Sequence, residues 1–296
     1  MRLLLDAGRM TPLRATVSYA VILGTLPYLT LKVSWLTGGR LGIADPELMN
    51  SPALFTANLV TGGMDLVAIV IALALTHRWG QKLPAWLVLF PAWVGTGFLL
   101  PIVLSSPAIG MDFVTNGTGG TALEPWVTPV VYASFTWQGV TLLAAFTLYV
   151  RSRWPHVFRH GEVTSGDLGP RGLAGAVLAV VACGFHVTWA ITGDLTPTLR
   201  VVNVVHGALA LAAAVGILAL SSRFRGSATV AVWIGSAGMF SWGMWTAVTE
   251  LGDLGALVQL GKGIGGVLLG LALLDKARDV ARGRASQPTR TPVAPG

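Results

Sequence analysis

The stretch ANLVTGGMDLVAIVIALAL, from Ala57 to Leu75, decides the fold because it is a long apolar run that carries one carboxylate, Asp65. Its length and composition predict a helix that crosses a membrane. A carboxylate in hydrocarbon is costly unless it is neutral, paired or next to water. Asn58, Thr61 and Asp65 are spaced i, i+3 and i+7, so they share one helix face. We therefore expect this face to look into the protein and Asp65 to be functional.

The composition also indicates a membrane protein. Hydrophobic residues make up 53% of the chain and charged residues only 11%, against about 25% charged residues in soluble domains. We therefore expect an all-α polytopic membrane helix bundle, with spans of roughly 20 residues each. Eight spans are predicted, at residues 14–34, 54–76, 84–105, 126–150, 172–192, 198–220, 228–249 and 255–274.

The distribution of charge predicts the topology. The net charge is +7, and sixteen of the twenty Lys and Arg fall on one side of the eight-span arrangement. The positive-inside rule then places both termini in the cytoplasm of a multi-pass protein of the cell membrane. The basic residues flank spans instead of forming one stripe, which argues against nucleic acid as a partner and leaves membrane lipid. The single cysteine, Cys183, excludes an internal disulfide and a thiolate metal cluster.

The two halves of the chain share a pattern of residues. The first span ends in Lys32-Val-Ser-Trp35 and the fifth in His186-Val-Thr-Trp189, while Asn58-Leu-Val-Thr61-Gly62 of the second span matches Asn203-Val-Val-His206-Gly207 of the sixth. We interpret this as a four-plus-four duplication, with the repeats related by an axis along the membrane normal. The alternative is chance similarity among Gly/Ala/Val/Leu-rich helices. The predicted domains are residues 1–160, the first four-helix membrane repeat, 161–280, the second repeat, and 281–296, a disordered cytoplasmic tail.

Polar residues differ between the aligned halves, which indicates a common scaffold carrying an asymmetric set of functional groups. The aligned pairs are Asp65 with Ala210, Thr61 with His206, Lys32 with His186, and Gln138 with Lys262. We expect Lys32 to extend toward the outer lipid headgroups. Lys262 either pairs with Asp65 or belongs to a substrate site. His186 and His206 are either core histidines bonded between helices or axial haem ligands.

Tryptophan is unusually frequent, with eleven residues, and several lie inside spans, where an interfacial belt does not explain them. Trp93 is one of these. Trp242, Thr246 and Glu250 follow i, i+4 and i+8 on the seventh span, so they share a face. That face places an aromatic surface below a carboxylate, and Trp245 lies on the same helix.

Several familiar chemistries are missing from the sequence. It contains no Walker loop, zinc signature, GxSxG elbow or aspartate-rich pair for magnesium diphosphate. We therefore expect no metal and no cofactor. Isolated acids, polar helix faces and interior tryptophans instead favour a lipophilic, uncharged substrate handled by proton transfer. The candidate catalytic residues are Asp65, Glu250 and His206, and the candidate substrate-binding residues are Asn58, Thr61, Trp93, His186, Trp242, Trp245 and Lys262.

With single intramembrane carboxylates on Gly/Ala-rich and Trp-rich spans, the chain resembles in plan the small integral-membrane terpene cyclases of bacterial and fungal meroterpenoid and indole-terpenoid pathways. The resemblance implies an isomerase or lyase type of enzyme of secondary metabolite biosynthesis that does not require diphosphate. In such an enzyme an acid protonates an alkene or epoxide of a prenylated aromatic, and the carbocation cyclises among aromatic side chains. Asp65 and Glu250 are the acids that the resemblance implies.

Two other classes of function compete with the cyclase. A small-molecule transporter or exporter commonly has duplicated halves and an ionisable residue at the midplane, and a non-catalytic membrane protein could assemble partners. The choice depends on Asp65. A protonated Asp65 can act as a general acid, whereas Lys262 or Lys32 within about 4 to 6 Å would make it half of an ion pair. The sequence specifies neither the substrate nor the oligomeric state.

Overall fold

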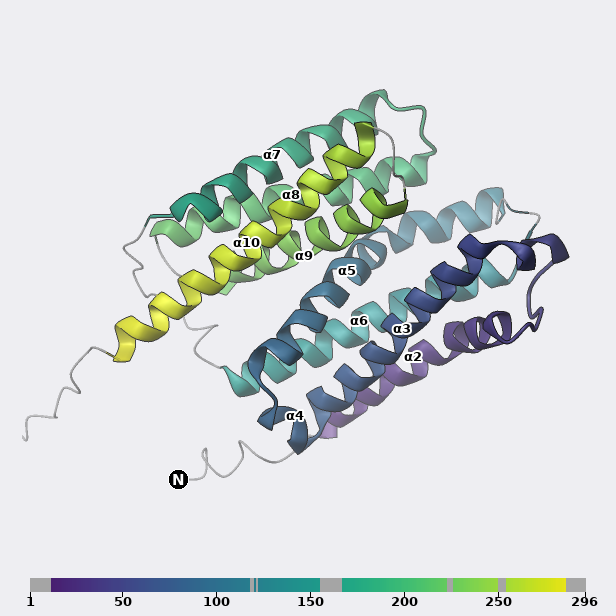
Figure 1. Ribbon diagram of the computed structural model, residues 1–296, viewed down its shortest axis with the longest axis horizontal. Helices are drawn as coiled ribbons and strands as arrows, with labels where there is room; N and C mark the ends of the chain where they lie inside the picture. Colours follow the sequence, from purple (N-terminus) through teal and green to yellow (C-terminus); the bar gives the residue numbers. More distant parts are fainter. Residues whose placement is uncertain are drawn as a thin grey trace, which may run out of the picture. The chain divides into compact units, whose positions relative to one another are not determined.

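The computed structural model describes residues 12–117, 120, 122–154, 167–222, 226–249 and 254–285. Eight long helices make up most of this part of the chain (Figure 1). They are α2 (Pro12–Leu36), α3 (Pro52–Thr76), α5 (Ala85–Asn116), α6 (Val127–Arg153), α7 (Gly169–Thr192), α8 (Pro197–Ser222), α9 (Gly226–Thr249) and α10 (Leu254–Ala285). Two short helices, η2 (Pro46–Asn50) and α4 (Arg78–Lys82), lie between them.

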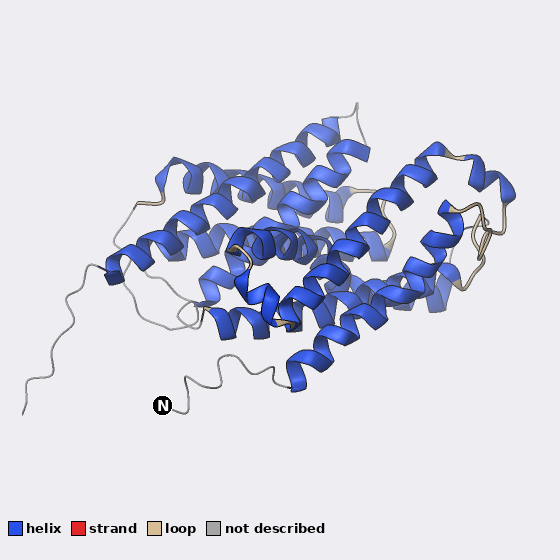
Figure 2. Cartoon of the chain, turned by 60° about the horizontal axis from the view of Figure 1, so that its bottom comes forward, coloured by secondary structure: helices blue, strands red, loops and turns tan. Residues whose placement is uncertain are grey.

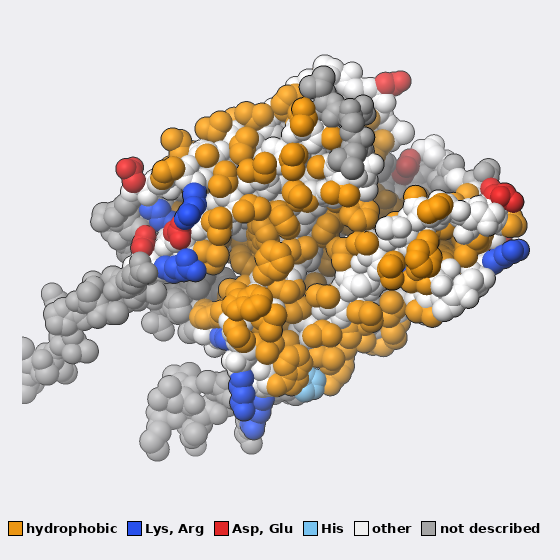
Figure 3. All heavy atoms as spheres, viewed as in Figure 1, with side chains coloured by type: hydrophobic (Ala, Val, Ile, Leu, Met, Phe, Trp, Pro, Cys, Tyr) orange, Lys and Arg blue, Asp and Glu red, His pale blue; other side chains and the backbone are white. Residues whose placement is uncertain are grey.

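The expected all-α polytopic bundle is confirmed. Among the described residues no β-strand occurs, and Figure 2 shows helices joined by loops. Seven of the long helices are long and apolar enough to cross a membrane. In Figure 3 hydrophobic side chains cover the visible faces of the long helices, whereas Lys, Arg, Asp and Glu lie near helix ends. This is the pattern of a bundle whose outer surface faces lipid.

The eighth long helix, α9, has the length of a span but is not among the seven helices that are apolar enough to cross a membrane. Its sequence is rich in Gly, Ser and Trp, and most of its buried residues are small. A Cβ atom added to Gly243 would lie 2.6 Å from the backbone nitrogen of Gly263 on α10. Small residues let two helix backbones approach this closely, so α9 owes its low hydropathy to packing against protein.

Two helices extend beyond their predicted ends. The third span was expected to end near residue 105, but α5 continues through Pro107 to Asn116. Proline has no N–H to donate to the carbonyl one turn earlier, which here belongs to Val103. The Ser106 hydroxyl donates to that carbonyl at 2.8 Å, so the helix continues without an unsatisfied acceptor. At the other end of the chain α10 runs to Ala285, past the start of the expected tail, and residues 286–296 lie outside the described part.

The chain divides into two compact units. Unit 1 comprises residues 1–156 and 183–208, and unit 2 comprises residues 157–182 and 209–296. In unit 1, α2 packs against α3 and α6, and α5 packs against α3 and α6. In unit 2, α9 packs along α10.

Two helix pairs within unit 1 repeat the same register. A Cβ atom placed on Gly62 of α3 would lie 3.7 Å from Lys32 Cδ of α2, and one placed on Gly207 of α8 would lie 3.5 Å from His186 Cβ of α7. The sequence alignment pairs these residues in the same way. Asn58 and Asn203, also aligned, each donate from Nδ2 to the carbonyl one turn earlier at 2.9 Å. These contacts agree with a duplication of the four-helix unit, which stays a prediction.

The interior of unit 1 is layered along the helix axes. One apolar cluster contains Val21 and Leu75 near one end of the helices, and a second contains Leu31 and Trp35 near the other. On α2 and α6 the buried polar residues Thr25, Ser134 and Gln138 lie between the two clusters along the chain. Lys32 lies between Leu31 and Trp35 of the second cluster, and Asp65 lies on α3 before the residues that belong to the first. A polar layer between two apolar layers excludes water from both sides of its charged groups, which strengthens their mutual attraction.

Loops at one end of unit 1 are joined by backbone hydrogen bonds. The α2–α3 connection and the α5–α6 connection meet at an isolated bridge between Ile43 and Leu123. The amide of Glu124 donates to the Gly42 carbonyl at 2.9 Å. The bridge ties the α2–α3 helix pair to the α5–α6 pair at this end.

Candidate functional site

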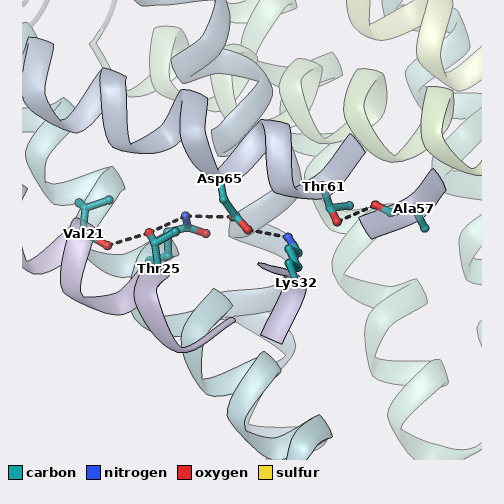
Figure 4. A network of polar contacts seen from close by, with 7 residues as sticks. Val21, Thr25, Lys32, Ala57, Thr61 and Asp65 are labelled. Carbon is teal, nitrogen blue, oxygen red and sulfur yellow. Dashed lines mark hydrogen bonds and ion pairs between the residues drawn. The ribbon is translucent and has the colours of Figure 1, made fainter. Parts of the chain in front are cut away.

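The polar layer of unit 1 is centred on an ion pair between α2 and α3. Lys32 Nζ donates to Asp65 Oδ2 at 2.5 Å, across 33 residues of sequence (Figure 4). The residues are 1% and 5% exposed. Asp65 lies near the middle of α3, thirteen residues after Pro52 and eleven before Thr76, so its carboxylate is far from both ends of that helix. Lys32 lies four residues before the end of α2 at Leu36.

The second carboxylate oxygen of Asp65 is bonded from α6. Gln138 Nε2 donates to Asp65 Oδ1 at 3.5 Å and to Thr25 Oγ1 at 3.0 Å, and Thr25 donates in turn to the Val21 carbonyl at 2.9 Å. The two N–H groups of the amide thus have one acceptor each. Asp65 accepts hydrogen bonds at both oxygens, which is the arrangement of an ionised carboxylate.

An aromatic ring forms another wall of the site. Lys32 Nζ lies 3.8 Å from the centroid of the Tyr28 ring, within the range of a cation–π contact. The Tyr28 ring packs edge-on against Phe135 of α6, with centroids 4.9 Å apart. Tyr28 precedes Lys32 by one helical turn, so the same face of α2 supplies both the cation and the ring.

The sequence expectation for Lys32 was wrong. The side chain does not extend to lipid headgroups but turns into the bundle, because the Asp65 carboxylate lies within reach and Gly62 leaves space beside the lysine stem. Asp65 is therefore half of an ion pair, as in the second of the two alternatives that the sequence left open. Charge attraction inside a low-dielectric interior exceeds what snorkelling offers a lysine whose stem is already surrounded by protein.

The two other polar residues predicted on the Asp65 face bond to their own helix. Asn58 is buried and donates to the Leu54 carbonyl at 2.9 Å, while the Thr61 hydroxyl donates to the Ala57 carbonyl at 2.7 Å. Figure 4 shows the Thr61 bond beside the ion pair. These residues lie on the face that carries Asp65, and their hydrogen bonds satisfy their polar groups within α3.

The predicted histidines do come together, in a second cluster of unit 1. The rings of His186 and His206 are stacked, with centroids 5.2 Å apart and planes 22° apart, and both residues are buried. His186 Nδ1 lies 2.8 Å from Asn203 Oδ1, and Asn203 Nδ2 donates to the Leu199 carbonyl. Since that amide presents its oxygen to His186, the Nδ1 of His186 is the donor.

This stacking bears on the haem alternative. Axial ligands of one haem iron point a nitrogen each at the metal from opposite sides. The two imidazole planes are only 22° apart and stacked face to face, so their nitrogens lie at the ring edges. The two histidines therefore do not point their nitrogens at one iron between them. Among the described residues no group of three or more His, Cys, Asp or Glu is placed to hold a metal ion.

The remaining candidates lie elsewhere in the chain. Trp93 is buried on α5 in unit 1, 6.2 Å from Phe90 between ring centroids. Trp242 and Trp245 of α9 are half-buried and Lys262 of α10 is buried, all in unit 2. Glu250, predicted as a catalytic acid, lies outside the described residues.

Sequence reasoning missed the roles of Tyr28, Thr25 and Gln138 in the site. The available signal was their spacing: Thr25 and Lys32 are seven residues apart on α2, with Tyr28 between them, so the three share a face. Comparisons with known protein families, with curated proteins and with solved structures find no match to this chain, so its site is interpreted from its own geometry.

Proposed function

We propose that the protein is a proton-linked carrier of a small molecule across the cell membrane, with the Lys32–Asp65 pair as its working centre. The observation that carries this proposal is the ion pair itself. It is buried, its carboxylate lies near the middle of α3, and Gln138 donates to the same carboxylate. Ionisable residues inside membrane spans commonly mark substrate and ion pathways. In transporters such residues lie near the midplane of the bilayer.

The energetics argue against a purely structural pair. Desolvating two charges costs so much that replacing a buried ion pair with apolar residues is often neutral or stabilising by about 1–4 kcal/mol. Both helices of the pair already supply apolar residues to the core: Leu31 and Trp35 of α2 belong to one cluster, and Ile71 and Leu75 of α3 belong to the other. If the ion pair makes the fold less stable than apolar residues would, its presence is consistent with selection for a function of the two charges.

The pair can act as a two-state device. In the described state Lys32 and Asp65 neutralise each other. Release of the Lys32 proton to water removes the attraction and lets the lysine side chain move away from Asp65, so protonation and side-chain position are linked. A ligand that interacts differently with the two states shifts the balance between them, which is the elementary requirement for coupling proton movement to solute movement.

The terpene cyclase alternative remains a second candidate because an aromatic ring lies beside the positive centre. The Tyr28 ring, backed by Phe135, faces the Lys32 nitrogen and would stabilise a carbocation in the same place. In that case Asp65 must donate a proton, whereas in the described state it accepts hydrogen bonds at both oxygens. We therefore rank the carrier first.

For the topology we propose eight crossings, including α9, with both termini in the cytoplasm. The basic residues support this arrangement by the positive-inside rule. Arg200, near the start of α8 and on the outer side in this arrangement, donates to the carbonyls of Ala190 in the last turn of α7 and of Gly193 and Leu195 just after it. Its charge is thus used to cap a helix C-terminus, which accounts for its presence there.

The test reconstitutes the protein in liposomes that contain a pH-sensitive dye. We expect at least one member of a panel of small amphiphilic solutes to cause proton movement in the wild type and none in Asp65→Asn. Ser134→Ala is the matched control, because it changes a buried polar residue of the same layer. Conversion of a prenylated substrate to a cyclic product, with no Asp65-dependent proton movement for any solute, would establish the cyclase and refute the carrier.

A further inference from the structure

The Lys32 ammonium occupies a site that has the walls of a receptor for an organic cation. Asp65 Oδ2 lies 2.5 Å from the nitrogen and the Tyr28 ring centroid lies 3.8 Å from it. A carboxylate supplies the counter-charge, and an aromatic face attracts ammonium groups, including those of ligands. The Phe135 ring supports the Tyr28 ring from the side, at 4.9 Å. None of these contacts requires that the ammonium group belong to a lysine.

We propose that Lys32 is an internal substitute for the substrate, and that the molecule carried is a small amphiphilic amine or quaternary ammonium cation that replaces the Lys32 ammonium against Asp65 and Tyr28. The inference rests on the proposed carrier function and specifies its substrate class. It replaces the uncharged substrate expected from the sequence. A charged substrate is expected because the Asp65 carboxylate needs a positive partner, and the lysine that now supplies it is on a side chain that can move away.

Charge balance sets the exchange. Asp65 balances one positive charge at a time in this apolar surrounding, so a second cation can enter only when Lys32 moves away or loses its proton. If the Lys32 ammonium releases its proton to water, the lysine becomes neutral and Asp65 keeps one negative charge for the entering cation. When the cation leaves, Lys32 takes up a proton and the pair forms again. One cation is thereby exchanged for one proton, and no other reactant is needed.

The shape of the site also suits a short alkyl chain. The lysine stem passes over Gly62, where an added Cβ would only reach contact distance, 3.7 Å from Lys32 Cδ. Truncation of Lys32 to alanine removes three carbons and the nitrogen, a group that corresponds to n-propylammonium. This ion is therefore a probe that fits the space released by the substitution.

The first experiment measures the thermal midpoint of detergent-solubilised Lys32→Ala with increasing n-propylammonium. We expect a saturable rise that 1-propanol does not cause. The rise should disappear in Lys32→Ala/Asp65→Asn, and in Lys32→Ala/Tyr28→Leu the ion should bind about 2- to 30-fold more weakly, the effect of losing a cation–π contact. An equal response to 1-propanol, or one that persists without Asp65, would overturn the assignment of the cation site.

The second experiment uses the wild type, so it does not depend on the folding of Lys32→Ala. We expect 2-phenylethylammonium to bind and to release protons in proteoliposomes, with both effects lost in Asp65→Asn, while 2-phenylethanol does neither. Binding without proton movement would retain the cation site and refute the carrier. Asp65-dependent proton movement with an uncharged solute, and no binding of amines to the wild type, would retain the carrier and refute the cationic substrate.

Discussion

Breaking the buried ion pair should destabilise the protein strongly. Lys32→Met leaves Asp65 with Gln138 as its hydrogen-bond partner among the described residues, and Asp65→Asn leaves the Lys32 ammonium facing a neutral amide. Removal of one partner from a buried pair costs roughly 3–5 kcal/mol, because the remaining charge is desolvated without compensation. With a conversion of about 2–4 °C per kcal/mol for chains of this size class, each single variant should lose about 6 to 20 °C in thermal midpoint.

The double variant Lys32→Met/Asp65→Asn decides whether the loss comes from the pair. With both charges removed, no buried charge remains uncompensated, so its midpoint should lie above that of at least one single variant. A coupling between the two substitutions of about 2 kcal/mol or more is expected for groups in direct contact. The assay is thermal unfolding in a mild detergent, followed by loss of monodisperse protein. Single variants as stable as the wild type, or strictly additive losses, would refute the reasoning.

Two further predictions concern packing and topology. Gly266→Leu should lower the thermal midpoint by about 2 to 12 °C through overpacking, because an added Cβ would lie 2.5 Å from the Ser236 carbonyl oxygen. Gly261→Leu is the control and should change the midpoint little, since an added Cβ there has nothing within 4 Å. Equal effects of the two substitutions would show that α9 and α10 do not pack as described. Reporter fusions at Gly169 and at the C-terminus should lie on the same side of the membrane, and a fusion at Gly117 should lie on the opposite side. If the Gly169 and C-terminal fusions lie on different sides, α9 does not cross the membrane.

The long helices were predictable because most of them contain a long run, with few charges, that is apolar enough to cross a bilayer. Their ends were less so. The continuation of α5 through Pro107 depends on one hydroxyl, that of Ser106, which satisfies the carbonyl that proline leaves open. A rule that assigns prolines to helix ends cannot anticipate that a serine hydroxyl will take the place of the missing proline N–H.

The candidate site was predictable only in part. Asp65 was identified from the sequence, since a charge inside an apolar run needs a partner wherever the helix packs. Its partner was not, because the choice between Lys32 and Lys262 depends on which helices are neighbours and at what register. That register depends on side-chain volumes across the whole α2–α3 contact, including the missing side chain at Gly62. The stacked histidines came together for the same reason, through a register that repeats the first.

The Lys32–Asp65 pair also constrains how the chain enters the bilayer. On its own, a lysine or an aspartate at the centre of a span adds about 2.5 to 3.5 kcal/mol to the free energy of insertion. Here α2 and α3 each carry one of the two charges and are joined by the short connection between Leu36 and Pro52. If the two helices leave the translocation machinery together, as a hairpin, the charges neutralise each other before either meets lipid. The ion pair would then favour co-insertion of the first two spans and set their register before the rest of the bundle has been synthesised.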